Sequence, residues 1–216
     1  IGNYMSYGDF RLDDTPFYEA AKLFPSGIVK NRDLSKVFEV DQTKITEDVT
    51  HAWYEGKTNL HPYDGETKPN YTGFGKKEDN IAYLDTQNKY TWIKSPLHDD
   101  ERMEVGPLAR MIIGVAKGDE RISKYVTTFL KNGNLPIKVL FSTVGRTAAR
   151  AIETELMADV MMEWVDELAL NVAHGDLSTW TEFNFDNVSA NTQGYGMAEA
   201  PRGGLGHWIK IKDGKV

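Results

Sequence analysis

The chain has 216 residues, of which 40% are hydrophobic and 26% charged, with a net charge of −7 and no cysteine. This composition is typical of a globular protein rather than a disordered one, and an acidic balance without any Lys/Arg-rich run argues against nucleic acid as a partner. No apolar run approaches the roughly 20 residues of a membrane span, and the missing cysteines exclude disulfides, thiolate metal ligands and a Cys nucleophile within this chain.

Residues 1–105 are rich in turn-forming and aromatic residues, with short β-like runs between them. The runs lie at 27–30, 36–40, 81–84 and 90–94, and the Gly/Pro/Asn/Asp-rich connections between them indicate turns. The segment TEDVTHAWYEG at 46–56 ends on a glycine, which favours a short helix there. We therefore predict an irregular region with small sheets over residues 1–105.

From Gly106 onward the apolar residues take helical spacing. Pro107 suits the first position of a helix and Gly118 its end. Asp119 is typical of the N-cap of a second helix, which the Asn132-Gly133-Asn134 run ends. The spacing places these residues on the apolar faces of the two helices: Leu108, Met111, Ile112 and Val115 on the first, and Ile122, Tyr125, Val126, Phe129 and Leu130 on the second.

The longest helical pattern begins near Gly145 and runs to about His174. Thr143 and Thr147 are candidate caps for its start, and Gly175 suits the position after its end. Helical spacing predicts one buried face and one exposed acidic row. The buried face comprises Ile152, Leu156, Val160, Trp164, Leu168 and Val172, and the acidic row comprises Glu155, Asp159, Glu163 and Asp166.

The C-terminal segment reads as loops followed by one strand. The alternating HWIKIK run at 207–212 reaches an Asp-Gly turn at 213–214, which is typical of the first half of a hairpin. We therefore expect a return strand after Val216 and interpret the chain as an internal segment of a longer protein. The predicted fold class is α+β: an irregular region over 1–105 and a long-helix region over 106–216, which ends in a glycine-rich loop and a strand, together forming one incomplete domain.

Two groups of residues are weak candidates for chemistry. The run His98-Asp99-Asp100-Glu101-Arg102-Met103-Glu104 offers oxygen ligands, but it lacks the spacing and glycine of a calcium loop. It therefore fits a solvated loop better than a metal site or a carboxylate-based hydrolase. The five histidines, at 51, 61, 98, 174 and 207, have no metal-ligand spacing, and we interpret most of them as hydrogen-bonded structural residues.

Arg202 is the sharper candidate. Pro201 fixes the chain direction before it, and Gly203 and Gly204 allow the backbone to approach another group closely. A guanidinium is always charged and offers a rigid fork of donors. On these residues alone, a structural arginine in a glycine-rich turn is an equally good interpretation.

Several long motifs lie in one order along the chain. They are MEVGPLAR at 103–110, GRTAAR at 145–150 and EAPRGGLGHW at 199–208, preceded by SYGDF at 6–10, HPYDGETKPNYTG at 61–73 and WIKSP at 92–96. Together they resemble the large, catalytic subunit of nickel–iron hydrogenases, and most closely its respiratory, membrane-attached uptake branch.

This resemblance implies a site at the EAPRG segment. Arg202 matches the arginine above the open nickel–iron position and is the expected catalytic residue. Ala200, Pro201 and Arg202 match the residues that line the pocket of the cofactor, whose iron carries CO and CN ligands. The family holds its metals by two Cys-x-x-Cys pairs, which this chain lacks, and a magnesium ion is a further expectation for the complete subunit. We expect no metal ligand in this chain and no metal bound by it alone.

The resemblance also implies an activity and partners. The activity is the reversible oxidation of H2 to protons and electrons, which pass to an iron–sulfur small subunit and from there to a membrane cytochrome b, on the periplasmic side of the cytoplasmic membrane. The 216 residues alone are expected to be inactive. The alternative is a structural and subunit-interaction domain with no activity or metal of its own.

Overall fold

The computed structural model describes the whole chain except residues 1, 14, 16–18, 66, 74, 79–80, 181, 183 and 185–187, and it describes only the backbone of the remaining residues in 76–83. The described part is an α+β structure, which confirms the predicted fold class. Its α-helices are α1 (Pro107–Lys117), α2 (Glu120–Asn132) and α3 (Thr143–Ala173). Its strands are β1 (Tyr4–Ser6), β2 (Asp9–Arg11), β3 (Lys22–Phe24), β4 (Gly27–Val29), β5 (Ile45–Asp48), β6 (Lys76–Glu78), β7 (Ile81–Tyr83), β8 (Ser95–His98), β9 (Thr192–Ala200) and β10 (Gly203–Ile211). The division of the chain at residue 105 stays a prediction.

The strands pair two by two, and each pair is antiparallel. The pairs are β1–β4, β2–β3, β5–β8, β6–β7 and β9–β10. The predicted strands at 27–30 and 81–84 are confirmed as β4 and β7. The predicted strands at 36–40 and 90–94 are wrong, because each makes only one isolated bridge, at Phe38 and at Thr91.

The helix predicted over 46–56 is also wrong. Residues 45–48 form strand β5, which pairs with β8 from Ile45 opposite His98 to Asp48 opposite Ser95. Side chains reinforce this pairing: the Lys94 ammonium lies 3.0 Å from the Glu47 carboxylate, and the Arg102 guanidinium lies 3.0 Å from that of Asp48. These contacts with residues about fifty positions away override the local preference, as is common for strands.

Helices α1 and α2 follow the predicted boundaries. Gly118 ends α1 in the left-handed conformation with φ of 73°, which glycine adopts without steric cost. The Asp119 carboxylate then accepts a hydrogen bond from the Ile122 amide at 2.8 Å and so caps α2. The first two helices are therefore predictable from their terminal residues.

Helix α3 is one uninterrupted helix of 31 residues, which confirms the long helical prediction. Its cap is neither Thr143 nor Thr147 but Ser142, whose hydroxyl accepts a hydrogen bond from the Gly145 amide at 3.0 Å. Ser142 has extended backbone angles, as an N-cap requires, whereas Thr143 already lies in the helix. Gly175 has φ of 84°, as predicted for the residue after the helix. None of the helices in the described ranges is both long and apolar enough to cross a membrane.

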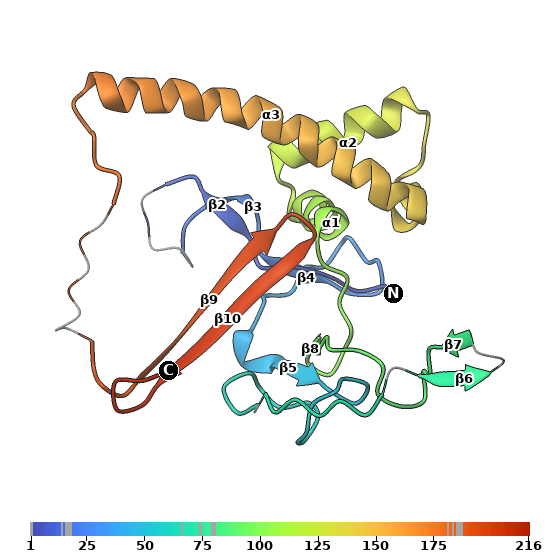
Figure 1. Ribbon diagram of the computed structural model, residues 1–216. Helices are drawn as coiled ribbons and strands as arrows, with labels where there is room; N and C mark the ends of the chain where they lie inside the picture. The colour runs from blue at the N-terminus through green and yellow to red at the C-terminus, as the bar shows by residue number, and fades with distance from the viewer. Residues whose placement is uncertain are drawn as a thin grey trace.

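The main core lies between the helices and strands β1, β3 and β4. From α3 it takes Ile152, Leu156 and Val160. The predicted burial is therefore correct for the first half of this helix, and Trp164 is half-buried. The prediction is wrong for Leu168 and Val172, which are 63% and 52% exposed, because α3 extends beyond the other two helices there (Figure 1). The acidic row, from Glu155 to Asp166, is exposed as predicted.

The C-terminal segment forms a long hairpin. Strands β9 and β10 pair from Thr192 opposite Ile211 to Ala200 opposite Gly203. Residues 192–200 were expected to be a loop, but they form strand β9. The strand at 207–211 is therefore the second strand of a hairpin and not the first half of one. The Asp213-Gly214 turn does form, and it closes a bridge between Lys212 and Lys215. The return strand expected after Val216 stays a prediction.

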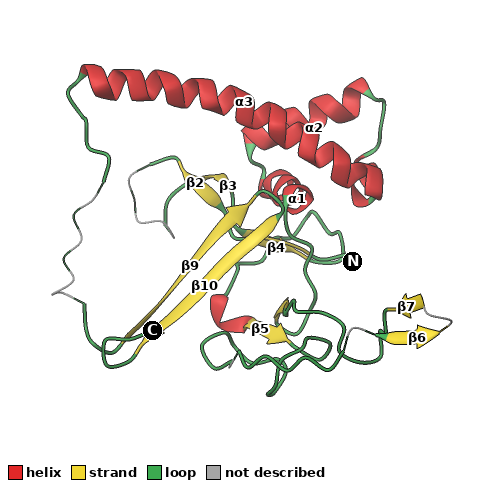
Figure 2. Ribbon diagram, viewed as in Figure 1, coloured by secondary structure: helices red, strands yellow, loops and turns green. Residues whose placement is uncertain are grey.

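The hairpin spans the molecule from α1 to the irregular region around β5 (Figure 2). Its tip lies beside the start of α1. Farther along, the Trp208 indole donates to the Gln42 amide oxygen at 2.9 Å, and the Lys210 ammonium donates to the Tyr63 carbonyl at 2.8 Å. The tip, which carries the predicted site, is thus held against the helical core.

Candidate functional site

The predicted site residues sit together at the tip of the β9–β10 hairpin. Pro201 and Arg202 form a two-residue turn between the paired residues Ala200 and Gly203. Ala200 is half-buried, whereas Pro201 and Arg202 are exposed. The Arg202 guanidinium forms no hydrogen bond or ion pair with any residue that the structure describes. A permanent positive charge is therefore presented without a partner from the described part of the chain.

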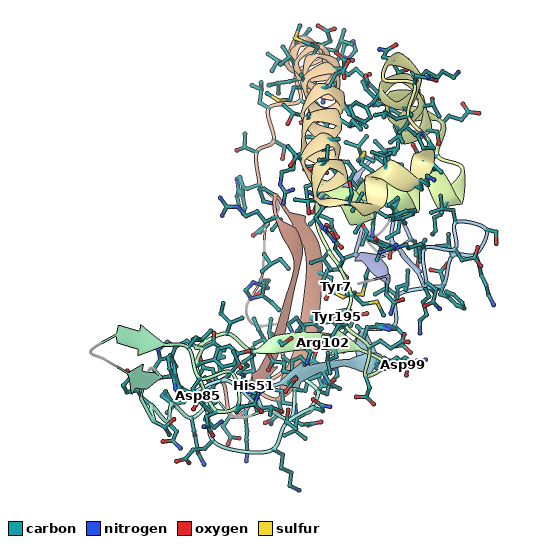
Figure 3. The ribbon with its side chains drawn as sticks, turned by 90° about the vertical axis from the view of Figure 1, so that its right-hand side faces the viewer. Tyr7, His51, Asp85, Asp99, Arg102 and Tyr195 are labelled. Carbon is teal, nitrogen blue, oxygen red and sulfur yellow. The ribbon has the colours of Figure 1, made fainter. Side chains whose placement is uncertain are left out.

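The tip packs closely on the start of α1. A β-carbon added to Gly106 would lie 2.5 Å from the Arg202 carbonyl oxygen, and Gly106 also has a positive φ of 99°. A β-carbon on Gly204 would lie 2.8 Å from the Tyr7 ring, which stands beside the hairpin (Figure 3). The close approach predicted from the glycines is therefore made to the protein's own segments.

A buried arginine holds the tip of the hairpin through hydrogen bonds to its backbone. The Arg110 side chain, on α1, is 1% exposed. It makes a bidentate pair with Glu153 on α3, with both N–O distances 2.7 Å, and donates to Glu199 at 2.6 Å. It also donates to the carbonyl oxygens of Ala200 at 3.0 Å and Pro201 at 3.2 Å. One guanidinium thus joins α1, α3 and the hairpin tip.

Glu199 is the most buried carboxylate of this cluster, with a side chain 2% exposed. It accepts hydrogen bonds from the Tyr7 amide at 2.6 Å and the Ser6 hydroxyl at 3.3 Å. Burial raises the pKa of the Glu199 carboxyl, against the lowering effect of Arg110 and the Tyr7 amide. Burial, together with the Glu199 charge, raises the pKa of Tyr7 to about 12. The cluster formed by Arg110, Glu199 and Tyr7 is therefore buried and strongly polar.

A second bidentate pair fixes the segment before α1. Arg146, near the start of α3, donates to the two Glu104 carboxylate oxygens at 2.5 and 2.7 Å. The Arg146 side chain is 37% exposed and that of Glu104 13%. This pair fastens residues 104–106 to α3, and the structure gives it no hydrogen bond to residues 200–202.

Sequence reasoning missed the residues behind the turn. Arg110, Arg146, Glu104 and Glu199 all stand inside the quoted motifs, but only Ala200, Pro201 and Arg202 were assigned to the site there, and Glu153 stands in none of the motifs. One signal was available: Arg110 is a charged residue within the otherwise apolar run PLARMIIG, and a buried arginine needs carboxylate partners. Which carboxylates those are depends on contacts 43 and 89 residues apart.

The acidic segment and the histidines form no metal site in the described ranges. There, no group of three or more His, Cys, Asp or Glu side chains is placed to hold a metal ion. Asp99 and Asp100 lie in an exposed turn, as the solvated-loop interpretation predicts, but that interpretation is wrong for Glu104, whose side chain is 13% exposed and pairs with Arg146. His98 is buried, which lowers its pKa, and it accepts a hydrogen bond from the Asp41 amide at 3.3 Å. His51 and His61 hydrogen-bond to the carbonyls of Asn88 and Gln42 at 2.8 and 3.1 Å.

Comparison with known proteins gives consistent matches along the whole chain. The family described as nickel-dependent hydrogenase matches residues 1–216. The quinone-reactive Ni/Fe-hydrogenase large chain of Wolinella succinogenes is 40% identical over 100% of this chain and 38% of its own length. The uptake hydrogenase large subunit of Rhodobacter capsulatus is 40% identical over 98% of this chain and 37% of its own. The chain thus spans less than two fifths of these relatives.

Solved structures agree with the sequence matches. The Ni-Fe-Se hydrogenase from Desulfovibrio vulgaris Hildenborough superposes with a TM-score of 0.68 at 27% identity, covering 99% of this chain and 40% of that one. The Ni-Fe-Se hydrogenase from Desulfomicrobium baculatum gives a TM-score of 0.66 at 28% identity, with 99% and 39% coverage.

Proposed function

Because the chain belongs to the nickel-dependent hydrogenase family, we propose that it is part of the catalytic large subunit of a hydrogenase that oxidises H2 reversibly. The observation that carries this proposal is the Arg202 guanidinium, which is exposed and unpaired within the described chain. It stands on a turn whose backbone carbonyls accept hydrogen bonds from the buried Arg110. Arg202 is the proposed catalytic residue, and Ala200, Pro201 and Arg202 are the proposed lining of the cofactor pocket.

These residues fit a position beside a metal centre and not among its ligands. A guanidinium offers five N–H donors and no acceptor, so Arg202 suits hydrogen bonds to anionic ligands. When bound, the nickel–iron centre with its CO and CN ligands supplies the cleavage of H2. Arg202 would donate to a cyanide nitrogen and stabilise negative charge there, while Ala200 and Pro201 would keep water away from that side. The thiolates that hold the metals, and the ligands of a magnesium ion, would belong to parts of the complete subunit outside this chain.

The proposed partners follow from the relatives. Two of them are named quinone-reactive and uptake hydrogenases, which supports delivery of electrons to an iron–sulfur small subunit and from there to a membrane cytochrome b. The proposed location is the periplasmic side of the cytoplasmic membrane. The 216 residues alone would be inactive and metal-free.

A second candidate function is subunit interaction. The second half of α3 exposes Met161, Val165, Leu168 and Val172, each more than half exposed. An apolar stripe of this kind marks an interaction surface. It supports packing against the rest of the large subunit or against the small subunit, with no chemistry in this chain itself.

Replacing Arg202 tests the proposed activity in the complete enzyme. Arg202→Lys should leave nickel and iron content near normal, because the metal ligands lie elsewhere, while H2 oxidation per metal-loaded enzyme falls on the order of 10²-fold, as for the loss of one preorganised donor. The infrared bands of the CO and CN ligands report whether the cluster is intact. Near-normal turnover would make Arg202 a turn residue only, and loss of the cluster would make its role assembly.

A metal analysis of the isolated chain tests whether the metal ligands lie outside it. Residues 1–216, produced in a host that matures hydrogenases, should contain no stoichiometric nickel or iron. Retention of both metals would overturn the proposal that their ligands lie outside this chain.

A further inference from the structure

The hairpin tip needs support that its own residues do not supply. Two-residue hairpin loops favour turns with positive φ at the first central residue, because these match the twist of the strands. Pro201 occupies that position, and its ring holds φ near −65°. Arg202 is likewise absent from the described residues with positive φ. The Pro201-Arg202 turn is therefore of a kind that splays the strands unless something else holds it.

Arg110 supplies that hold, and its donors are fully used. Its Nε–H and one Nη2–H go to Glu153, and one Nη1–H goes to Glu199. The two remaining N–H groups donate to the carbonyls of Ala200 and Pro201. Each of the five donors of a guanidinium thus has its own acceptor, and two of these acceptors are the backbone carbonyls that immediately precede Arg202.

We propose that Arg110 is a positioning residue for Arg202. The carboxylates of Glu153 and Glu199 orient the Arg110 guanidinium, and the guanidinium sets the two peptide planes that lead into Arg202. This inference rests on the proposed function of Arg202, since positioning matters only if that side chain has a defined target. A misplacement of about 1 Å in a catalytic group costs on the order of 10²-fold in rate.

Arg146 is the matched control. It also makes a bidentate pair with a carboxylate, that of Glu104, and it fastens the segment before α1 to α3. It makes none of the hydrogen bonds to Ala200 and Pro201 that Arg110 makes. Changes at Arg146 therefore perturb the same framework without removing a hydrogen bond to the turn.

The test compares Arg110→Lys, Arg146→Lys and Arg202→Lys in the complete, metal-loaded enzyme. Lysine keeps the charge but has three donors in place of five, so Arg110→Lys should lower H2 oxidation on the order of 10-fold or more. It should also shift or broaden the infrared cyanide bands and speed hydrogen exchange in the peptide 197–206. Arg146→Lys should leave the cyanide bands and this exchange unchanged.

A double variant distinguishes positioning from general stability. If Arg110 acts only through Arg202, the effect of Arg110→Lys on turnover should vanish in an Arg202→Lys background, because coupled residues are non-additive. Additive losses, or equal losses for Arg110→Lys and Arg146→Lys, would overturn the proposal. If Arg110→Lys enzyme does not mature, Glu153→Gln keeps the shape of the bidentate partner, and unchanged cyanide bands and exchange in that variant would overturn it as well.

The same measurements separate this inference from the proposed function. If Arg202→Lys retains normal turnover, the catalytic role of Arg202 fails, whatever the exchange data show. If Arg202→Lys loses turnover but exchange in 197–206 is the same in Arg110→Lys as in the native enzyme, the catalytic role stands and positioning by Arg110 is refuted.

Discussion

The two halves of α3 carry the same apolar spacing in opposite surroundings. Ile152, Leu156 and Val160 are at most 3% exposed, whereas Leu168 and Val172 are 63% and 52% exposed. Figure 1 shows the first half crossing the other helices and the second half extending past them. Periodicity therefore specifies a helix and its apolar face, but burial of that face depends on what the chain can place against it.

The difference in helix length explains why the second half of α3 is exposed. Helix α3 has 31 residues, whereas α1 has 11 and α2 has 13. At 1.5 Å per residue, α3 is about 46 Å long and its two neighbours about 16 and 20 Å. They can cover only part of it. If the chain is part of a larger subunit, as proposed, further segments of that subunit would cover the remainder; the relatives are more than twice as long as this chain.

The largest expected effect in this comparison comes from Leu156→Ala in the buried half. Leu156 is fully buried in the main core, so its truncation leaves a cavity and should lower the free energy of unfolding of the chain by about 2–5 kcal/mol. Urea unfolding followed by circular dichroism measures this. A loss of less than about 1 kcal/mol in the free energy of unfolding would mean that the first half of α3 is not held by the main core.

The two ends of α3 provide an intermediate test. Ser142→Ala removes the hydroxyl that accepts from the Gly145 amide and should cost about 1 kcal/mol. Gly175→Ala strains a residue with φ of 84° at the other end, but that end frays locally because little packs on it. Its effect on global unfolding should therefore be smaller. Equal costs at the two ends would show that the exposed half is as firmly held as the buried one.

The fold was predictable wherever local chemistry decides. Asp119, Gly118 and Gly175 gave the ends of the helices, and these were confirmed. Local preference failed where partners distant in sequence decide: residues 45–48 became a strand because β8 pairs with them, and β9 was missed because the Gly- and Asn-containing run around it resembles a loop. The N-cap of α3 is Ser142, whereas the predicted caps were Thr143 and Thr147; the nearer of the two lies within the ordinary uncertainty of helix ends.

The candidate site divides in the same way. Arg202 could be singled out because its neighbours Pro201, Gly203 and Gly204 are unusual in themselves. The cluster behind it could not be assembled, because Arg110, Glu153 and Glu199 meet only after α1, α3 and the hairpin have packed together. The catalytic role of Arg202 and the positioning role of Arg110 stay predictions, which the variants test.

The smallest effect on the chain itself is expected from Leu168→Ala in the exposed half. Because Leu168 is 63% exposed, its truncation should change the free energy of unfolding of the chain by no more than about 0.5 kcal/mol. In the complete enzyme the same substitution should lower the yield of assembled, metal-containing protein, because there the stripe would be covered and the truncation would leave a gap in a packed interface. Comparing unfolding of the chain with the yield of the complete enzyme tests both parts. A large cost in the chain, or no effect in the complete enzyme, would mean that this half of α3 is not an interface.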